Sequence, residues 1–186
     1  MPFGSLWLPG VASAVAVFIL SSIIHMVLKY HRADYKKLAD EDAVAAGLRK
    51  AAPSPGLYML PYCSDMAQMK DPAFLKRFED GPVAIIAMVP KGRPNMGKSL
   101  GLWFLLCLLV SFVTAYVARH TLNAGTSGLE VLRITSTIAF IGYGFGYFQD
   151  SIWKATPWSN TLRGLLDALI YGVATGFVFK LLWPAA

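Results

Sequence analysis

The chain has 186 residues, of which 55% are hydrophobic and 15% carry a formal charge, and its mean hydropathy is +0.49. These values exclude an ordinary water-soluble domain and indicate an integral membrane protein. The formal net charge is +6, but eight acidic residues between positions 30 and 98 dilute any basic surface, so nucleic acid is not an expected partner.

Four apolar stretches, each close to the ~20 residues that a helix needs to cross a bilayer, define the predicted architecture. They run over 8–28, 100–118, 131–149 and 162–183. The sequence therefore predicts an all-α membrane protein of four transmembrane helices, divided into a first helix (1–29), a polar loop region (30–98) and a three-helix region (99–186). Residues 1–10 contain no basic residue, so the first stretch is expected to be a retained anchor rather than a cleaved signal.

The polar region from 30 to 98 sets the expected orientation. Of the 17 Lys and Arg residues, twelve lie between Lys29 and Lys98. Positively charged loops are retained in the cytoplasm, so this region is expected to be cytoplasmic and both termini to face outward. The lipid bilayer is thus the predicted partner, and the predicted location is a cell inner (plasma) membrane that the chain crosses several times.

Within this polar region the sequence predicts a small α or α+β fold. Two short helices are expected over about 40–50 and 71–81, each with an aspartate as the cap at its start. Two apolar runs, 57–60 and 83–89, either pair as strands, or the second run lies on the membrane surface.

The segment from Gly92 to Ser99 matches the phosphate-binding pattern G-x-x-x-x-G-K-[ST]. A bound nucleotide is nevertheless not expected, because the helix that follows is a predicted membrane crossing and the chain has no room for the parallel sheet of that architecture. We interpret the segment as a turn that places Lys98 at the level of the lipid headgroups. No cofactor is predicted.

Glycines at four-residue spacing mark the third and fourth apolar stretches. Gly142 and Gly146 form one pair, and Gly172 and Gly176 form the other. Small residues at this spacing let two helices approach closely. The four glycines are therefore predicted packing positions, either within one chain or between the chains of a homo-oligomer.

Polar side chains are predicted to converge at the cytoplasmic ends of the helices. Asp150 ends the third stretch on the same helical face as Tyr143 and Tyr147, while Asp167 lies near the start of the fourth stretch and His25 near the end of the first. Ionisable groups inside a membrane are costly, so these five residues form a candidate proton or cation site.

A structural alternative explains the same carboxylates. Asp150 is four residues from Lys154, and Asp167 is four residues from Arg163. Each pair has the spacing of an ion pair on one helix face, which would only fix the end of a helix. The sequence favours this alternative over a role in transport.

The three histidines do not predict a metal or haem site. His25 and His31 lie near the cytoplasmic end of the first stretch, whereas His120 lies at the external end of the second. A haem between two histidines needs ligands at similar depth on facing helices. We expect His25 to form a hydrogen bond, and a metal or pigment site with this single histidine is the less favoured alternative.

The function that the sequence favours is a non-enzymatic accessory or assembly subunit of a larger membrane complex, with residues 30–98 as its docking surface. The alternative is a small oligomeric transporter or channel for protons or cations that uses the carboxylates. A membrane enzyme is less favoured, because the chain shows no spacing of nucleophile and base or of metal ligands.

Overall fold

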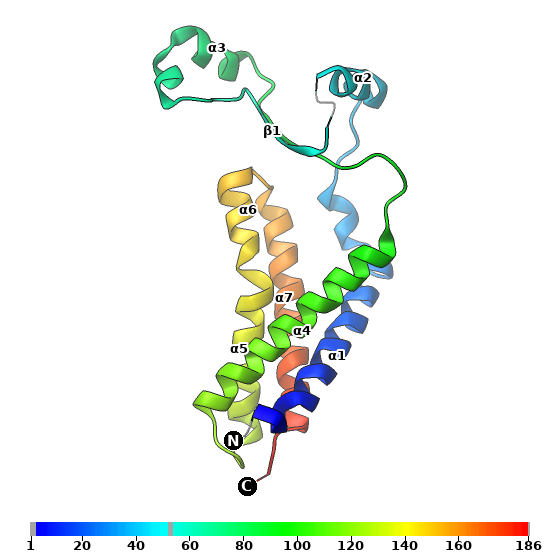
Figure 1. Cartoon of the computed structure of the whole chain (residues 1–186), viewed down its shortest axis with the longest axis vertical. Helices are drawn as coiled ribbons and strands as arrows, with labels where there is room; N and C mark the ends of the chain where they lie inside the picture. The colour runs from blue at the N-terminus through cyan, green and yellow to red at the C-terminus, as the bar shows by residue number, and fades with distance from the viewer. Residues whose placement is uncertain (1–2, 52–53, 186) are drawn as a thin grey trace. The chain divides into compact units, whose positions relative to one another are not determined.

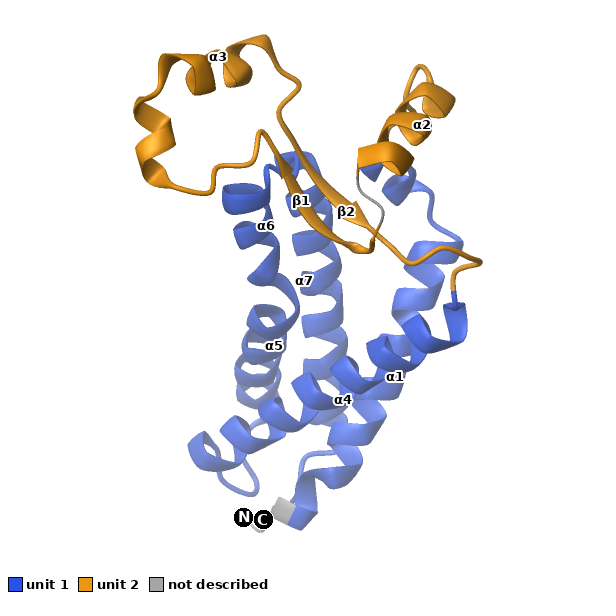
Figure 2. Ribbon diagram, turned by 45° about the horizontal axis from the view of Figure 1, so that its top comes forward, with its two compact units in different colours: residues 1–35, 95–186 blue, residues 36–94 orange. Residues whose placement is uncertain are grey.

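The computed structural model describes residues 3–51 and 54–185, which fall into two compact units (Figure 2). The first unit is helical and comprises Met1–Tyr35 together with Asn95–Ala186, and the second comprises Lys36–Pro94. The polar region was predicted to begin at residue 30. In the structure, however, residues 30–35 belong to the helical unit, which also contains the candidate site.

The helical unit is a bundle of helices, and short connections join those of its second segment, Asn95–Ala186 (Figure 1). Its elements are the 3₁₀ helices η1 (Phe3–Leu6) and η2 (Tyr30–Asp34) and the α-helices α1 (Trp7–Met26), α4 (Met96–Thr121), α5 (Gly128–Gly144), α6 (Gly146–Lys154) and α7 (Trp158–Leu181). α1 packs against both α4 and α7, and α5 packs along α7 (Figure 1).

Three helical segments are long and apolar enough to cross a membrane: Gly4–Met26, Met96–Thr121 and Trp158–Leu181. Their outer surfaces are apolar as well, since Leu102, Leu105 and Leu109 follow one face of α4 and are each about 60% exposed. The chain is therefore a multi-pass membrane protein by helix length and composition.

The third predicted crossing, 131–149, is not a single helix in the structure. α5 and α6 are separated at Phe145, inside the glycine-rich run 142–146. Glycine in a helix interior costs about 1 kcal/mol relative to alanine, which explains why the helix is interrupted there. With 17 residues, α5 is shorter than the other long helices, so a fourth crossing through α5 and α6 stays a prediction.

Two clusters of buried side chains form the core of the bundle, one toward each end. The cluster near the start of α1 contains Leu6, Ala115, Ala118, Leu122, Val131 and Phe179. The cluster near the end of α1 contains Ala14, Val17, Ile24, Cys107 and Tyr171, with Tyr30 and Trp103 packed against it. The second cluster includes a residue of η2, so η2 is part of the bundle and not of the polar loop.

The closest helix approach is between α5 and α7. A Cβ atom added at Gly172 would lie 2.9 Å from the backbone oxygen of Ser136, and one added at Gly176 would lie 2.8 Å from the backbone oxygen of Leu132. Both distances are too short for a carbon atom. The two glycines therefore lie where the backbones of α5 and α7 meet.

The two glycines of the other pair, Gly142 and Gly146, differ in what surrounds them. A Cβ atom at Gly142 would lie 3.0 Å from Cγ1 of Val110 on α4, so this glycine permits close packing of α5 and α4. No described atom lies within 4 Å of the corresponding position at Gly146. Gly146 is thus not a packing position within the chain, and it lies instead at the start of α6, where the helix is interrupted.

The second unit has a small α+β fold. It contains α2 (Glu41–Ala51), the 3₁₀ helix η3 (Met66–Lys70), α3 (Pro72–Asp80) and two strands, β1 (Gly56–Leu60) and β2 (Ala84–Met88), which pair antiparallel. Asp40 and Asp71 cap the two α-helices as expected, each accepting a backbone N–H at 2.9 Å. Of the two alternatives for the apolar runs, the structure has the paired strands.

The segment from Gly92 to Ser99 leads directly into α4. The Asn95 side chain accepts the backbone N–H of Lys98 at 3.0 Å and so caps this helix. The strand before the segment, β2, pairs antiparallel with β1 in a sheet of two strands, not in a parallel sheet. The segment therefore acts structurally as a turn and a helix cap.

Candidate functional site

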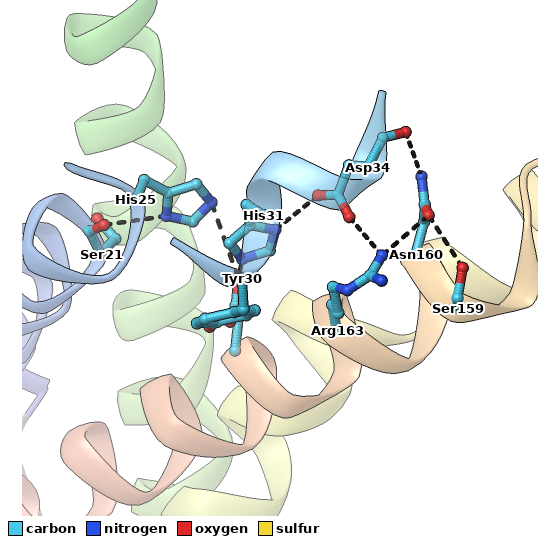
Figure 3. Close-up of polar contacts among 9 residues, drawn as sticks. Ser21, His25, Tyr30, His31, Asp34, Ser159, Asn160 and Arg163 are labelled. Atoms are coloured by element: carbon cyan, nitrogen blue, oxygen red, sulfur yellow. Dashed lines mark hydrogen bonds and ion pairs between the residues drawn. The ribbon is translucent and has the colours of Figure 1, made fainter. Parts of the chain in front are cut away.

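A buried carboxylate on α7, Asp167, is the centre of the candidate site. Its side chain is 2% exposed. The 3₁₀ helix η2 packs against this part of α7 and contributes Tyr30, His31 and Asp34, and the last turn of α1 contributes His25 (Figure 3). Two neighbouring segments, the end of α1 and η2, thus meet α7, which follows them by more than 130 residues, at one end of the bundle.

Side chains from η2 and α1 contact both oxygens of Asp167. Tyr30 donates its phenolic O–H to Oδ1. Nε2 of His31 lies 2.8 Å from Oδ2, and Nε2 of His25 lies 3.8 Å from the same oxygen. The two imidazole rings are stacked, with centroids 4.5 Å apart and an interplanar angle of 9° (Figure 3). Oδ2 therefore faces two imidazole nitrogens side by side.

The second nitrogen of each imidazole determines what the first presents to Asp167. Nδ1 of His25 lies 3.0 Å from the backbone oxygen of Ser21, which can only accept, so Nδ1 donates. Nδ1 of His31 lies 2.6 Å from Oδ2 of Asp34, a carboxylate that also pairs with Arg163. A neutral imidazole then presents a lone pair on Nε2 toward Asp167, whereas an imidazolium donates from Nε2, and the 2.8 Å contact of His31 fits either a donated hydrogen bond or a shared cation. Oδ2 and these nitrogens are favourable together only with a positive charge among them, either a proton on an imidazole or a bound cation.

Asp34 joins η2 to the start of α7. Its Oδ1 accepts a hydrogen bond from Arg163 at 2.8 Å, and its backbone oxygen accepts one from the Asn160 amide at 3.0 Å (Figure 3). Arg163 donates in addition to Oδ1 of Asn160 at 3.2 Å. The Asp34 and Arg163 side chains are only 19% and 26% exposed, so solvent screens their attraction less than at a surface. These contacts hold η2 in place and orient His31.

Tyr30 anchors η2 in the apolar core. Its ring packs against the buried cluster that includes Ile24 and Tyr171. Burial, together with the hydrogen bond to Asp167, raises the pKa of the Tyr30 phenol above its ordinary value. The phenol therefore stays protonated and acts as a donor to the carboxylate.

A pocket of about 390 Å³ adjoins the cluster. Its lining includes His25, His31 and Asp34 together with Tyr147, Asp150 and Asn160. The two histidines thus border both the buried carboxylate and an open cavity.

The residues predicted for the site are only partly brought together. His25 and Asp167 meet, and Tyr147 lies at the adjoining pocket with its ring against Gly164. Asp150 is at the pocket wall, where its carboxylate is 43% exposed and pairs with Lys154 at 2.6 Å.

Tyr143 points elsewhere. Its ring packs against Trp103 and Tyr171, with centroids 6.1 and 5.5 Å away. It therefore lies in the apolar core cluster near the end of α1 and not at the pocket.

The ion pair that the sequence suggested for Asp167 is not formed. Arg163 contacts Asp34 on η2 and not Asp167, whereas the pair between Asp150 and Lys154 is present. The structural alternative thus holds for one of the two carboxylates. Among the described residues, the only basic groups within 4.0 Å of Asp167 are the two imidazoles.

Three residues of the site were missed from the sequence: Tyr30, His31 and Asp34. They were assigned to the polar loop because the apolar stretch ends at residue 28. The spacing of His31 and Asp34 was the available signal, because residues three apart in a helical turn can contact each other. Nothing in the sequence indicated that this turn packs against α7.

Four buried side-chain hydroxyls have no hydrogen-bond partner among the described residues. They belong to Ser136, Tyr143, Tyr171 and Thr175. Tyr171 is one helical turn beyond Asp167 on α7 and is 3% exposed. Unpaired polar groups inside a bundle are costly and call for a partner such as an ordered water molecule. The interior next to Asp167 is therefore more polar than an ordinary helix core.

Comparisons with protein-family models, with curated proteins and with solved structures find no match for this chain. The arrangement around Asp167 is therefore the basis for the functional argument.

Proposed function

We propose that the protein is a small membrane carrier that binds a cation at Asp167. The observation that carries this proposal is the convergence of two imidazole Nε2 atoms, from His25 and His31, on one oxygen of a buried carboxylate. Of the two functions considered from the sequence, this geometry supports cation transport better than a purely structural role.

The electrostatics of the site support cation binding. Removing an ionised carboxylate from water costs several kcal/mol unless a positive charge or good hydrogen bonds compensate it. Tyr30 supplies one hydrogen bond to Asp167, and Arg163 is already paired with Asp34. The remaining negative charge on Oδ2 attracts a cation, and the nitrogen lone pairs of the two histidines stabilise the same cation.

The surroundings of the site support transport of the cation rather than binding alone. The pocket beside His25 and His31 provides access from one end of the bundle. On the other side of Asp167, the buried hydroxyls of Tyr171 and Tyr143 provide polar groups deeper in the helices. Carboxylates and polar groups within membrane helices commonly mark ion pathways. The basic residues of the polar region favour an orientation with the pocket on the cytoplasmic side.

The first prediction concerns flux in liposomes. The purified protein should carry at least one cation of a panel of H⁺, Na⁺, K⁺, Mg²⁺ and Zn²⁺, and Asp167→Asn should abolish this flux because it removes the charge at the centre of the site. The matched control is Asp80→Asn, whose exposed carboxylate on α3 pairs with Lys76 away from the site; it should keep the flux. No flux in the parent protein, or equal flux in Asp167→Asn, contradicts the proposal.

The accessory-subunit function stays as a second candidate. Residues 36–94 form a compact unit of their own, with a sheet of only two strands and exposed apolar side chains such as Leu57, at 68%. Exposed strand edges and apolar side chains are typical of surfaces that bind another protein. A stoichiometric partner that co-purifies from the native membrane would favour this candidate.

A further inference from the structure

We propose that His25, His31 and Asp167 form a binding site for a divalent transition-metal ion of the zinc class. The inference rests on the proposed cation site and specifies the cation that fits it. The three ligand atoms are Nε2 of His25, Nε2 of His31 and a carboxylate oxygen of Asp167, and all lie within 4.8 Å of one another.

The chemistry of these donors selects the metal. Two imidazole nitrogens and one carboxylate oxygen suit Zn²⁺ and neighbouring transition metals, whereas Mg²⁺ and Ca²⁺ prefer sites built from oxygen atoms. Three protein ligands also leave a coordination position for water or another ligand, as in many zinc sites that are not purely structural. Both histidines line the pocket, so we place this open coordination position toward it.

The distances are close to those that a metal requires. Zinc bonds of 2.0–2.2 Å in a tetrahedral site place two ligand atoms about 3.3 Å apart. Oδ2 of Asp167 lies 2.8 Å from Nε2 of His31 and 3.8 Å from Nε2 of His25. The two distances bracket this value, and a small shift of the 52% exposed His25 side chain, with its Nδ1 contact kept, would bring both close to it.

The residues around the ligands complete the arrangement. A metal-binding histidine usually donates its other ring N–H to a carboxylate or a backbone oxygen, which fixes the ring and the tautomer. Asp34 accepts from His31 in this way, and the backbone oxygen of Ser21 accepts from His25. Both Nε2 atoms are therefore oriented as ligands before any ion binds.

The second prediction is a metal-binding measurement on the full-length protein in detergent after treatment with a chelator. Titration with Zn²⁺ should show one ion bound per chain. His31→Ala and Asp167→Asn should each weaken binding by about 100-fold or more, because each removes a ligand. The matched control is His120→Ala, which removes an exposed imidazole on the last turn of α4 and should leave the affinity unchanged.

A spectroscopic measurement keeps the test independent of how the variants fold. Co²⁺ added to the unmodified protein should give the intense visible absorption of a four-coordinate ion, and one equivalent of Zn²⁺, but not Mg²⁺ or Ca²⁺, should abolish it.

Absence of this absorption together with no zinc binding overturns the metal site. Flux of another cation that depends on Asp167, without zinc binding, would overturn this inference and leave the proposed carrier intact. Zinc binding without any flux would support the metal site and contradict the carrier.

Discussion

Single residues in this site have distinct tasks. In the proposed site, Asp167 supplies the charge, His25 and His31 supply nitrogen ligands, and Asp34 acts through His31 by accepting a hydrogen bond from its Nδ1. Tyr30 differs from the others because it both packs in the apolar core and donates a hydrogen bond to Asp167. The stability of the bundle end and the geometry of the site are therefore linked through this one side chain.

The third prediction tests this link. Tyr30→Phe keeps the aromatic ring and removes only the O–H that donates to Asp167. A hydrogen bond to a charged group is worth about 1.5–3 kcal/mol, so the thermal unfolding temperature in detergent should fall measurably. Tyr35→Phe is the control, because the Tyr35 side chain is 90% exposed, and it should unfold as the parent does. Equal unfolding temperatures for the parent and both variants would show that the hydrogen bond is not important for stability.

At the scale of elements, the position of α7 against α5 sets the depth and rotation of Asp167. Gly172 is five residues beyond Asp167 and lies where the backbones of the two helices meet. Any side chain at this position pushes the helices apart and also turns or shifts the carboxylate. Packing in the middle of the bundle is therefore coupled to the site at its end.

The fourth prediction is that Gly172→Ala destabilises the bundle. The added Cβ would lie 2.9 Å from a backbone oxygen of α5, and overpacking of this kind costs about 1–3 kcal/mol, more than the gain in helix propensity. Gly101→Ala on α4 is the matched control, because no described atom lies within 4 Å of its Cβ position. The control should be neutral or slightly stabilising. Thermal unfolding and zinc titration of both variants measure the two effects, and an unchanged Gly172→Ala protein would contradict the close approach.

At the scale of the whole molecule, orientation follows from charge. The helical unit carries its candidate site at the end from which residues 36–94 extend along the chain, and this region holds most of the basic residues. The positive-inside rule therefore supports a cytoplasmic location for the polar unit and for the pocket.

The fifth prediction tests the orientation in intact cells. A membrane-impermeant thiol reagent should label a cysteine introduced as Asn123→Cys, in the connection between α4 and α5, but not the native Cys63. After the cells are opened, Cys63 should react, since its side chain is partly exposed, while the buried Cys107 should stay unlabelled. Labelling of Cys63 in intact cells would reverse the orientation and place the pocket on the external side.

The sequence by itself determined the class of protein and most of its local structure. Long apolar stretches predicted the membrane helices, and Asp40 and Asp71 predicted the starts of two short helices, because hydropathy and capping act between near neighbours. The glycines at 142–146 are a local signal as well, but they were interpreted only as packing positions, so the interruption of the helix through 131–149 at Phe145 was not predicted. There the glycine run outweighs the apolar signal.

Only the tertiary structure decided the composition of the site. Local spacing paired Asp167 with Arg163, but the folded chain pairs Arg163 with Asp34 and surrounds Asp167 with residues more than 130 positions away. Such partners depend on how each helix is rotated and on where η2 packs after the chain leaves α1. These are consequences of packing across the whole bundle, and no spacing along the sequence encodes them.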